Sequence, residues 1–262
     1  MHHESALGPT TCPEGGLIGN LVVVGSFSAI MGGLGLMNSI GIYQAWISTH
    51  QLSNISEGQI GWIFGIYNFL VFFCGIQIGP IFDIKGPKLL MWIGSSLLVL
   101  TFILMGFCQE YWQFLIVIGI LGGTGTSFIF IVPVASIGHF FIKRRGAATG
   151  LALAGGSIGG VIFPLVLLYL APQIGFAWAS RVVGLITLIL LIPGCLLVRA
   201  NFPPKIPSRP SLKVFLPDLT ILKDPVLALT TMGVFFIEWG FFIPLEYIAS
   251  YSIASGISHN LS

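Results

Sequence analysis

The chain has very little charge for its length. Only 8% of its 262 residues are Asp, Glu, Lys or Arg, whereas 55% are hydrophobic and the mean hydropathy is +0.96. Soluble domains carry about 25% charged residues, so this composition excludes an ordinary soluble protein and indicates a membrane protein. The formal net charge of +2 is small and its cations are scattered over connecting segments, so we do not expect nucleic acid as a partner.

The signatures of soluble enzymes and of metal sites are also missing. We find no cluster of metal ligands, no nucleophile elbow and no phosphate-binding loop in the sequence. The four cysteines follow no metal-binding spacing, and three of them fall inside apolar runs. We therefore interpret them as small buried side chains rather than disulfides. We expect no enzymatic activity, no metal and no cofactor.

Long apolar runs are the main feature that the sequence does have. A bilayer span needs about 20 mostly apolar residues, and we count seven such runs. The predicted spans are residues 18–43, 60–81, 88–107, 112–137, 147–170, 178–199 and 226–249. The sequence therefore predicts an all-α membrane protein that crosses the bilayer several times.

The cations lie almost entirely on one side of these spans. Ten of the eleven fall in the connections after the second, fourth and sixth spans, and the exception is Arg181. The ten are Lys85, Lys88, Lys143, Arg144, Arg145, Arg199, Lys205, Arg209, Lys213 and Lys223. Because cytoplasmic loops are enriched in Lys and Arg, these connections and the N-terminus are predicted to be cytoplasmic.

A long segment rich in proline and mixed in charge divides the chain after the sixth span. We expect a cytoplasmic tail at 1–17, a six-span bundle at 18–199 and a cytoplasmic linker at 200–225. Residues 226–262 are then a seventh span with an outer tail. This order is what a twelve-span protein would show if it were cut short after its seventh span.

The connection between the second and third spans contains the pattern G-x-x-x-D-x-x-G-x-K. Gly79, Asp83, Gly86 and Lys88 form it, and Lys85 lies between them. Asp83 can accept hydrogen bonds or pair with a cation, and Gly86 permits a tight turn; an ordinary polar turn is the alternative. The pattern resembles the cytoplasmic-loop signature of the major facilitator superfamily. That resemblance implies a six-helix N-terminal bundle, the first helix of a C-terminal half, and a gating charge latch between the halves at Asp83.

The cluster Lys143, Arg144 and Arg145 leads into a span with a regular pattern of small residues. Gly and Ala recur there at intervals of four, which lets a second helix approach closely. The glycines that we assign to helix packing are Gly146, Gly150, Gly155, Gly156, Gly159 and Gly160.

The stretch 139–156 resembles the second signature of the monocarboxylate transporter family, with His139 where that family usually has Tyr. Matches at 38–44, 176–181 and 238–244 are similar to the fungal, riboflavin- and monocarboxylate-permease-like branch. The resemblance implies that the basic cluster and the Asp83 loop clasp the cytoplasmic face when the cavity opens outward. In animal members of that family, a lysine late in the first span is associated with the transport of monocarboxylates. The first predicted span of this chain holds no lysine, so the family resemblance does not identify the substrate.

Polar residues within the spans are candidate contacts for a substrate or a proton. Arg181 could serve an anionic substrate or an outer gate, or it could extend to the lipid headgroups. Glu238 falls near the middle of the seventh span, where burial would favour its protonated form. We expect it to carry the coupling proton, with a hydrogen bond to a neighbouring helix as the alternative. Asn38 and Asn68 could line a cavity, although amides in spans by default bond across helices.

These patterns and the resemblance predict a secondary active transporter. We expect proton-coupled movement of a small organic solute, such as a monocarboxylate or related metabolite, by alternating access. The expected partners are this solute, for which an anion is one option, a proton and the lipid bilayer. We expect the plasma membrane rather than a vacuolar or other internal membrane. The alternatives are a truncated fragment or regulatory paralogue without transport activity, and a seven-span receptor, whose N-terminus would lie outside.

Overall fold

The computed structural model describes residues 15–201 and 224–254, and much of 239–254 by its backbone alone. Within these ranges every regular element is a helix. The all-α fold predicted from the apolar runs is therefore confirmed. The tail before Gly15 and most of the predicted linker lie outside the described residues, and so do the four cations from Lys205 to Lys223.

Six helical stretches of the described chain are long and apolar enough to cross a membrane. They are α1 with α2 (Gly16–Thr49), α3 (Glu57–Lys85), α4 (Pro87–Met105), α5 to α6 (Tyr111–Ile137), α7 (Arg145–Ile174) and α8 (Phe176–Leu197). Each corresponds to one of the first six predicted spans. The seventh predicted span lies in α9 (Pro225–Ala254), whose described apolar part is Pro225–Glu238.

Two of the six spans are composite. The first is divided at Ser39 into α1 (Gly16–Asn38) and α2 (Ile40–Thr49), and the Ser39 hydroxyl donates to the carbonyl of Gly35. The fourth consists of α5 (Tyr111–Phe114), the π-helical segment η1 (Leu115–Gly122) and α6 (Gly123–Ile137). Both breaks fall inside runs that are apolar as a whole, so the predicted spans 18–43 and 112–137 did not show them.

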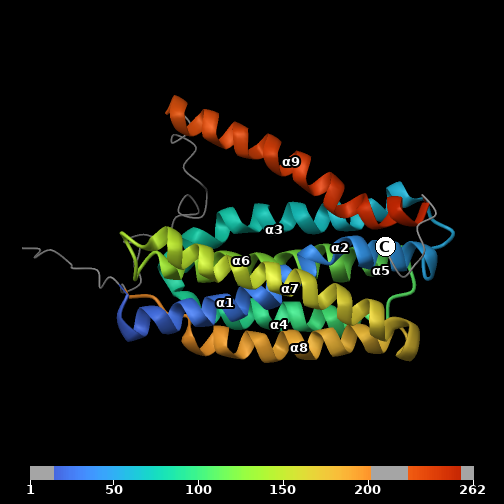
Figure 1. Ribbon diagram of the computed structural model, residues 1–262, viewed down its shortest axis with the longest axis horizontal. Coiled ribbons are helices and arrows are strands. Elements are labelled where there is room, and N and C mark those ends of the chain that lie inside the picture. The colour runs from blue at the N-terminus through green and yellow to red at the C-terminus, as the bar shows by residue number, and fades with distance from the viewer. Residues whose placement is uncertain (1–14, 202–223, 255–262) are drawn as a thin grey trace, which may run out of the picture.

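The first span lies at the centre of the bundle. None of its residues from Gly25 to Ser48 is exposed. Its α1 part packs most extensively against α7, and also against α8 and α6. On the other side of α6 lies α3, while α4 packs against both α6 and α8. Figure 1 shows these spans side by side, with α9 running obliquely to them, and α9 packs against α2.

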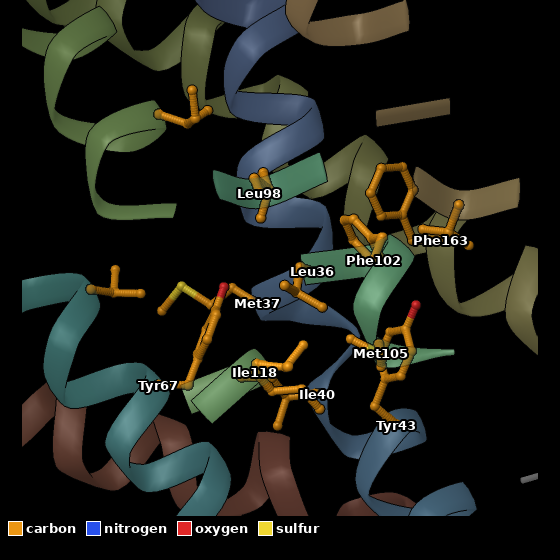
Figure 2. Packing of buried hydrophobic residues seen from close by; sticks show 14 of the residues in the cluster. Leu36, Met37, Ile40, Tyr43, Tyr67, Leu98, Phe102, Met105, Ile118 and Phe163 are labelled. Carbon is orange, nitrogen blue, oxygen red and sulfur yellow. The ribbon is translucent and has the colours of Figure 1, made fainter. Parts of the chain in front are cut away.

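Apolar side chains from all six spans meet in one core. Figure 2 shows Leu36, Met37, Ile40, Tyr43, Tyr67, Leu98, Phe102, Met105, Ile118 and Phe163. The rings of Phe102 and Phe163 are packed edge to face, with centroids 6.5 Å apart. Large apolar side chains also cover the outside of the bundle, for example Trp62 and Leu185. A protein that is apolar both inside and outside is suited to lipid.

The connections between spans gather at two ends of the bundle. At one end, the N–H of Gly15, just before α1, donates to the carbonyl of Phe140 in the α6–α7 connection at 3.2 Å. The ring of Phe82 near the end of α3 lies 5.4 Å from that of His139. We call this the basic end, because α3, α4, α7 and α8 bring Lys85, Lys88, Lys143, Arg144, Arg145 and Arg199 to it. The connections α2–α3, α4–α5 and α7–α8 lie at the opposite end (Figure 1).

Candidate functional site

The α3–α4 connection is a single tight turn at Gly86. This residue has φ 75° and ψ 176°, and its N–H donates to the carbonyl of Phe82 at 2.8 Å. Such a conformation is essentially restricted to glycine. Pro87 then starts α4 at a position where proline's fixed φ suits a helix. Gly79 differs from Gly86, because it lies within α3 and a side chain there would meet nothing within 4 Å.

Asp83 lies in the last turn of α3, two residues before its end at Lys85. Its side chain is exposed, and it has no ion pair with any cation in the described ranges. Lys85 and Lys88 on either side of the turn are exposed as well. The loop therefore presents one carboxylate and two ammonium groups to its surroundings, and the predicted latch would have to find its partner outside the described bundle.

Two phenylalanines fasten the α6–α7 connection to the start of α1. Phe140 and Phe141 are buried in a small cluster with Val22 and Val23. A methyl group on Gly19 would lie 3.3 Å from the Phe141 ring, so the close approach needs a small residue on α1. We call this packing of Phe140 and Phe141 against the start of α1 the aromatic lock. The sequence analysis did not predict it, although two adjacent aromatic residues shortly before the basic cluster were a usable signal.

The basic cluster projects from this fastened loop. Lys143, Arg144 and Arg145 are exposed, and the guanidinium carbon of Arg145 would lie 3.2 Å from a methyl group built on Gly138. The edge-to-face contact between Phe82 and His139 places this loop beside the Asp83 loop. The basic end thus brings together the two loop motifs that the sequence singles out.

Four glycines of α7 lie against α1. A methyl group on Gly155 would collide with the carbonyl of Phe27, and one on Gly159 with the carbonyl of Met31. Gly156 faces Leu34, and Gly160 faces Asn38, each with a side-chain atom within 2.8 Å of an added methyl group. These four glycines therefore let the two helix backbones approach closely, as small residues do between membrane helices.

Gly146 and Gly150 have no such role in the described bundle. A methyl group on either would meet nothing within 4 Å among the described residues, and both positions are exposed. Ala154, one turn further on, is exposed too. The packing predicted for Gly146 and Gly150 remains a prediction about a neighbour outside the described chain.

The two candidate asparagines differ in their surroundings. The side-chain amide of Asn38 donates to the carbonyl of Gly156 at 3.1 Å, so Asn38 joins α1 to α7. The side-chain oxygen of Asn68 on α3 is buried and has no hydrogen-bond partner among the described residues. A buried carbonyl oxygen without a donor is costly, so Asn68 is the better candidate for contact with a bound solute.

Further polar groups without partners lie on α2, and the sequence analysis did not select them. Tyr43 and Gln44 are 1% and 2% exposed, and neither the hydroxyl nor the side-chain oxygen finds a partner in the described chain. The usable signal was the polar pair Asn38-Ser39, which interrupts the apolar run directly before α2. By contrast, the Tyr67 hydroxyl on α3 is paired with Thr126 at 2.9 Å.

No hydrogen bond or ring contact joins Arg181 to these partnerless groups in the described bundle, although Tyr43 packs against Phe176 at the start of the same helix, α8. Arg181 lies on α8 near the opposite end, and its guanidinium carbon is 4.6 Å from the centroid of the Phe107 ring and 4.8 Å from that of Trp178. Glu238 is in the described part of α9, where its side chain is exposed. The structure thus does not bring Arg181 and Glu238 into one polar site.

No metal centre is found in the parts of the chain that the structure describes: no group of three or more His, Cys, Asp or Glu side chains gathers there. The polar groups of this bundle are instead hydroxyls and amides in the spans and charges at the two ends. Such an arrangement can bind an organic solute through hydrogen bonds and can form ion pairs at the basic end.

Comparisons with known proteins extend these observations. The sequence profile of the Major Facilitator Superfamily matches residues 17–262. The chain is 37% identical over 260 residues to the MFS-type transporter pytF of Aspergillus terreus, covering 99% of this chain and 86% of that protein.

Two further fungal relatives are longer. The chain is 35% identical over 263 residues to the aspyridones efflux protein apdF of Emericella nidulans, covering 100% of this chain and 52% of the relative. It is 34% identical over 242 residues to the agnestins efflux protein AgnL12 of Paecilomyces divaricatus, covering 92% of this chain and 55% of the relative. The chain thus spans about half the length of these two relatives.

Proposed function

Because the chain belongs to the major facilitator superfamily, we propose that it moves a small organic solute across a membrane by secondary active transport. The observation that supports this most directly is the family match over residues 17–262 of a chain whose described part contains six membrane-length helices. The monocarboxylate-like branch and a monocarboxylate cargo remain part of this proposal, and so does the plasma membrane as its location.

The proposed direction is outward. Two relatives at 35% and 34% identity are named as efflux proteins. The partnerless hydroxyl and amide oxygens of Tyr43, Gln44 and Asn68 favour a cargo that donates hydrogen bonds. The test is efflux from preloaded proteoliposomes with a panel of labelled organic solutes, neutral and anionic. Uptake in place of efflux would overturn the proposed direction. Transport only of solutes that lack a hydrogen-bond donor would overturn the proposed contacts with these three oxygens.

We propose that the basic end works as a gate. In alternating access, the six spans rock as one body around a solute site near the membrane midplane. The Asp83 loop and the Lys143–Arg145 loop lie side by side at one end, where they present the Asp83 carboxylate and a larger number of cationic side chains. Ion pairs between these loops and a second bundle would hold this end closed, and their release would open it.

Coupling to protons is assigned in this proposal to Glu238. A carboxyl group at this position can be protonated on one side of the membrane and deprotonated on the other as access alternates. Glu238→Gln cannot exchange a proton, so we expect proton-driven transport to fall at least tenfold while solute exchange without a gradient persists. Glu57→Gln, an exposed acid in the first turn of α3, is the matched control. Unchanged proton-driven transport in Glu238→Gln would overturn the assignment.

A second candidate is that residues 1–262 alone do not transport. The uncovered faces of α3 and α7 favour it, because only 28% and 33% of the residues in their apolar segments are buried within the described bundle. A chimera in which the second half of the Emericella nidulans relative follows this chain should then transport, whereas the chain alone should not. Transport by the chain alone, at a rate proportional to its amount, would exclude this candidate.

A further inference from the structure

The geometry points to a binding site for the phosphate group of a membrane phospholipid, formed by Arg181, Trp178 and Phe107 at the opposite end of the bundle. The proposal does not rest on the proposed transport function, since the two rings of the site lie at the exposed surface of the described bundle. Of the alternatives that the sequence leaves open for Arg181, this proposal selects contact with the lipid headgroups over contact with a substrate or a role in an outer gate.

The guanidinium of Arg181 is held between two aromatic rings. Its central carbon lies 4.6 Å from the centroid of Phe107 and 4.8 Å from that of Trp178. Cation–π contacts of this kind fix the position of a guanidinium without neutralising its charge. They also supply no oxygen acceptor for its five N–H donors.

No carboxylate whose side chain the structure describes pairs with Arg181. The described acidic side chains at the same end are those of Glu57 and Glu110, at the starts of α3 and α5. The Glu110 side chain is engaged in capping α5 through a backbone N–H. Glu57 is exposed, and neither acid forms an ion pair with Arg181. A charged side chain within an apolar helix needs a partner, so the site calls for an anion from its surroundings.

Exposed tryptophans indicate that this site lies at the depth of the lipid headgroups. Trp62, Trp112 and Trp178 lie within the first two turns of α3, α5 and α8, which all begin at the opposite end, and they are 67%, 60% and 60% exposed. Tryptophan is enriched where a membrane protein crosses the headgroup region. Helix side chains also lean toward the helix N-terminus. The guanidinium of Arg181 is therefore directed toward the headgroups, where phosphate is the abundant anion.

An apolar stripe continues from Arg181 along α8. Leu185, Ile189 and Ile192 follow it at helical spacing on the outside of the bundle, and they are 57%, 59% and 46% exposed. A phospholipid whose phosphate lies on Arg181 can place an acyl chain along this stripe. A guanidinium suits such a headgroup because it binds a phosphate with two parallel hydrogen bonds. Free phosphate has the same headgroup chemistry but lacks the acyl chain.

Thermal unfolding of the purified whole chain in a non-ionic detergent tests the site. Phosphatidylglycerol, a digalactosyl lipid with the same acyl chains, and inorganic phosphate are titrated separately. We expect phosphatidylglycerol to raise the unfolding midpoint more than the other two additives. In Arg181→Gln the concentration of phosphatidylglycerol needed for half of the shift should rise about tenfold, as expected for the loss of a charge-assisted hydrogen bond.

Matched variants separate this site from general lipid binding. Arg199→Gln removes an exposed cation just beyond the other end of α8, and its response should equal that of the unaltered protein. Trp178→Leu retains the charge but loses one ring, so its half-maximal concentration should rise by less than that of Arg181→Gln. If Arg181→Gln does not fold, Trp178→Leu replaces it. Bound phospholipid is then counted by native mass spectrometry at the half-maximal concentration of the unaltered protein, and an unchanged count overturns the site. An unchanged response in Arg181→Gln, an equal effect of the galactolipid, or full replacement by inorganic phosphate would each overturn the proposal.

Discussion

At the scale of single residues, the glycines of α7 differ in what surrounds them. A methyl group on Gly159 would collide with the backbone carbonyl of Met31 and lie 3.2 Å from the Cα of Gly35. Backbone cannot swing aside as a side chain can, so Gly159→Ala must separate α1 from α7. We expect it to lower the free energy of unfolding by about 1–3 kcal/mol. The measurement is the thermal unfolding midpoint in detergent, followed by circular dichroism.

Gly150→Ala is the matched control on the same helix. An added methyl group at Gly150 meets nothing within 4 Å in the described bundle. Alanine favours a helix over glycine by about 1 kcal/mol, so this variant should be as stable as the unaltered protein or slightly more so. If Gly150→Ala lowered the stability as much as Gly159→Ala, the close contact between α1 and α7 would not be the cause of the loss.

The same glycines show how far the sequence reaches at this scale. Spacing by four residues places Gly146 with Gly150, and Gly155 with Gly159, on common helix faces, and both pairs were predicted to pack. Only the structure tells the pairs apart, because spacing gives the face of a helix but not what lies opposite. For the same reason, the sequence could not show that the side-chain amide of Asn38 donates a hydrogen bond to the carbonyl of Gly156.

At the scale of elements, the turn between α3 and α4 depends on Gly86. Its φ of 75° with ψ of 176° lies in a region that costs other residues about 1–3 kcal/mol. Gly86→Ala should therefore destabilise the protein by roughly that amount and loosen the turn that presents Asp83. Gly79→Ala, seven residues earlier in the same motif, adds a methyl group in open space within a helix. Hydrogen exchange of the α3–α4 segment should rise in Gly86→Ala and stay unchanged in Gly79→Ala.

The α6–α7 loop depends in the same way on its aromatic lock. Phe141 is 6% exposed and packs against the start of α1, whereas its neighbour Ile142 is 63% exposed. Phe141→Ala should cost about 3–5 kcal/mol, the range for truncating a buried phenylalanine, and Ile142→Ala should cost little. Protease cleavage after the Lys143–Arg145 cluster checks the local effect. Equal cleavage of the two variants would mean that Phe141 does not hold the loop.

Element boundaries show a clear limit of prediction from the sequence. The six described spans were found because each is a long apolar run, and bilayer thickness sets its minimum length. The break at Ser39 and the π-helical segment Leu115–Gly122 were not found. The first interrupts its apolar run by only two polar residues, and the second is apolar throughout. Local hydrogen bonding, such as that of Ser39 with Gly35, decides these features. Hydropathy does not report it.

At the scale of the whole molecule, the distribution of charge predicts the orientation in the membrane. Arg181 is the exception among the cations of the described chain, since the others lie at or just beyond the basic end. We expect this end to face the cytoplasm, because loops rich in Lys and Arg are retained there. A membrane-impermeant maleimide should then label Gln109→Cys in intact cells. It should label Arg144→Cys only after the membrane is opened.

The native cysteines allow this experiment with one change, Cys12→Ser. Cys74 and Cys195 lie within α3 and α8, and burial raises the pKa of the Cys108 thiol, beside Gln109, to about 11. Because the thiolate is the reactive form, Cys108 should stay largely unlabelled near neutral pH, and its labelling should increase as the pH rises toward that pKa. Labelling of Arg144→Cys in intact cells, with Gln109→Cys protected, would reverse the orientation and assign the Asp83 and Lys143–Arg145 loops to the outer face. A gate closed by these loops would then have to act on the outward-facing side of the transport cycle.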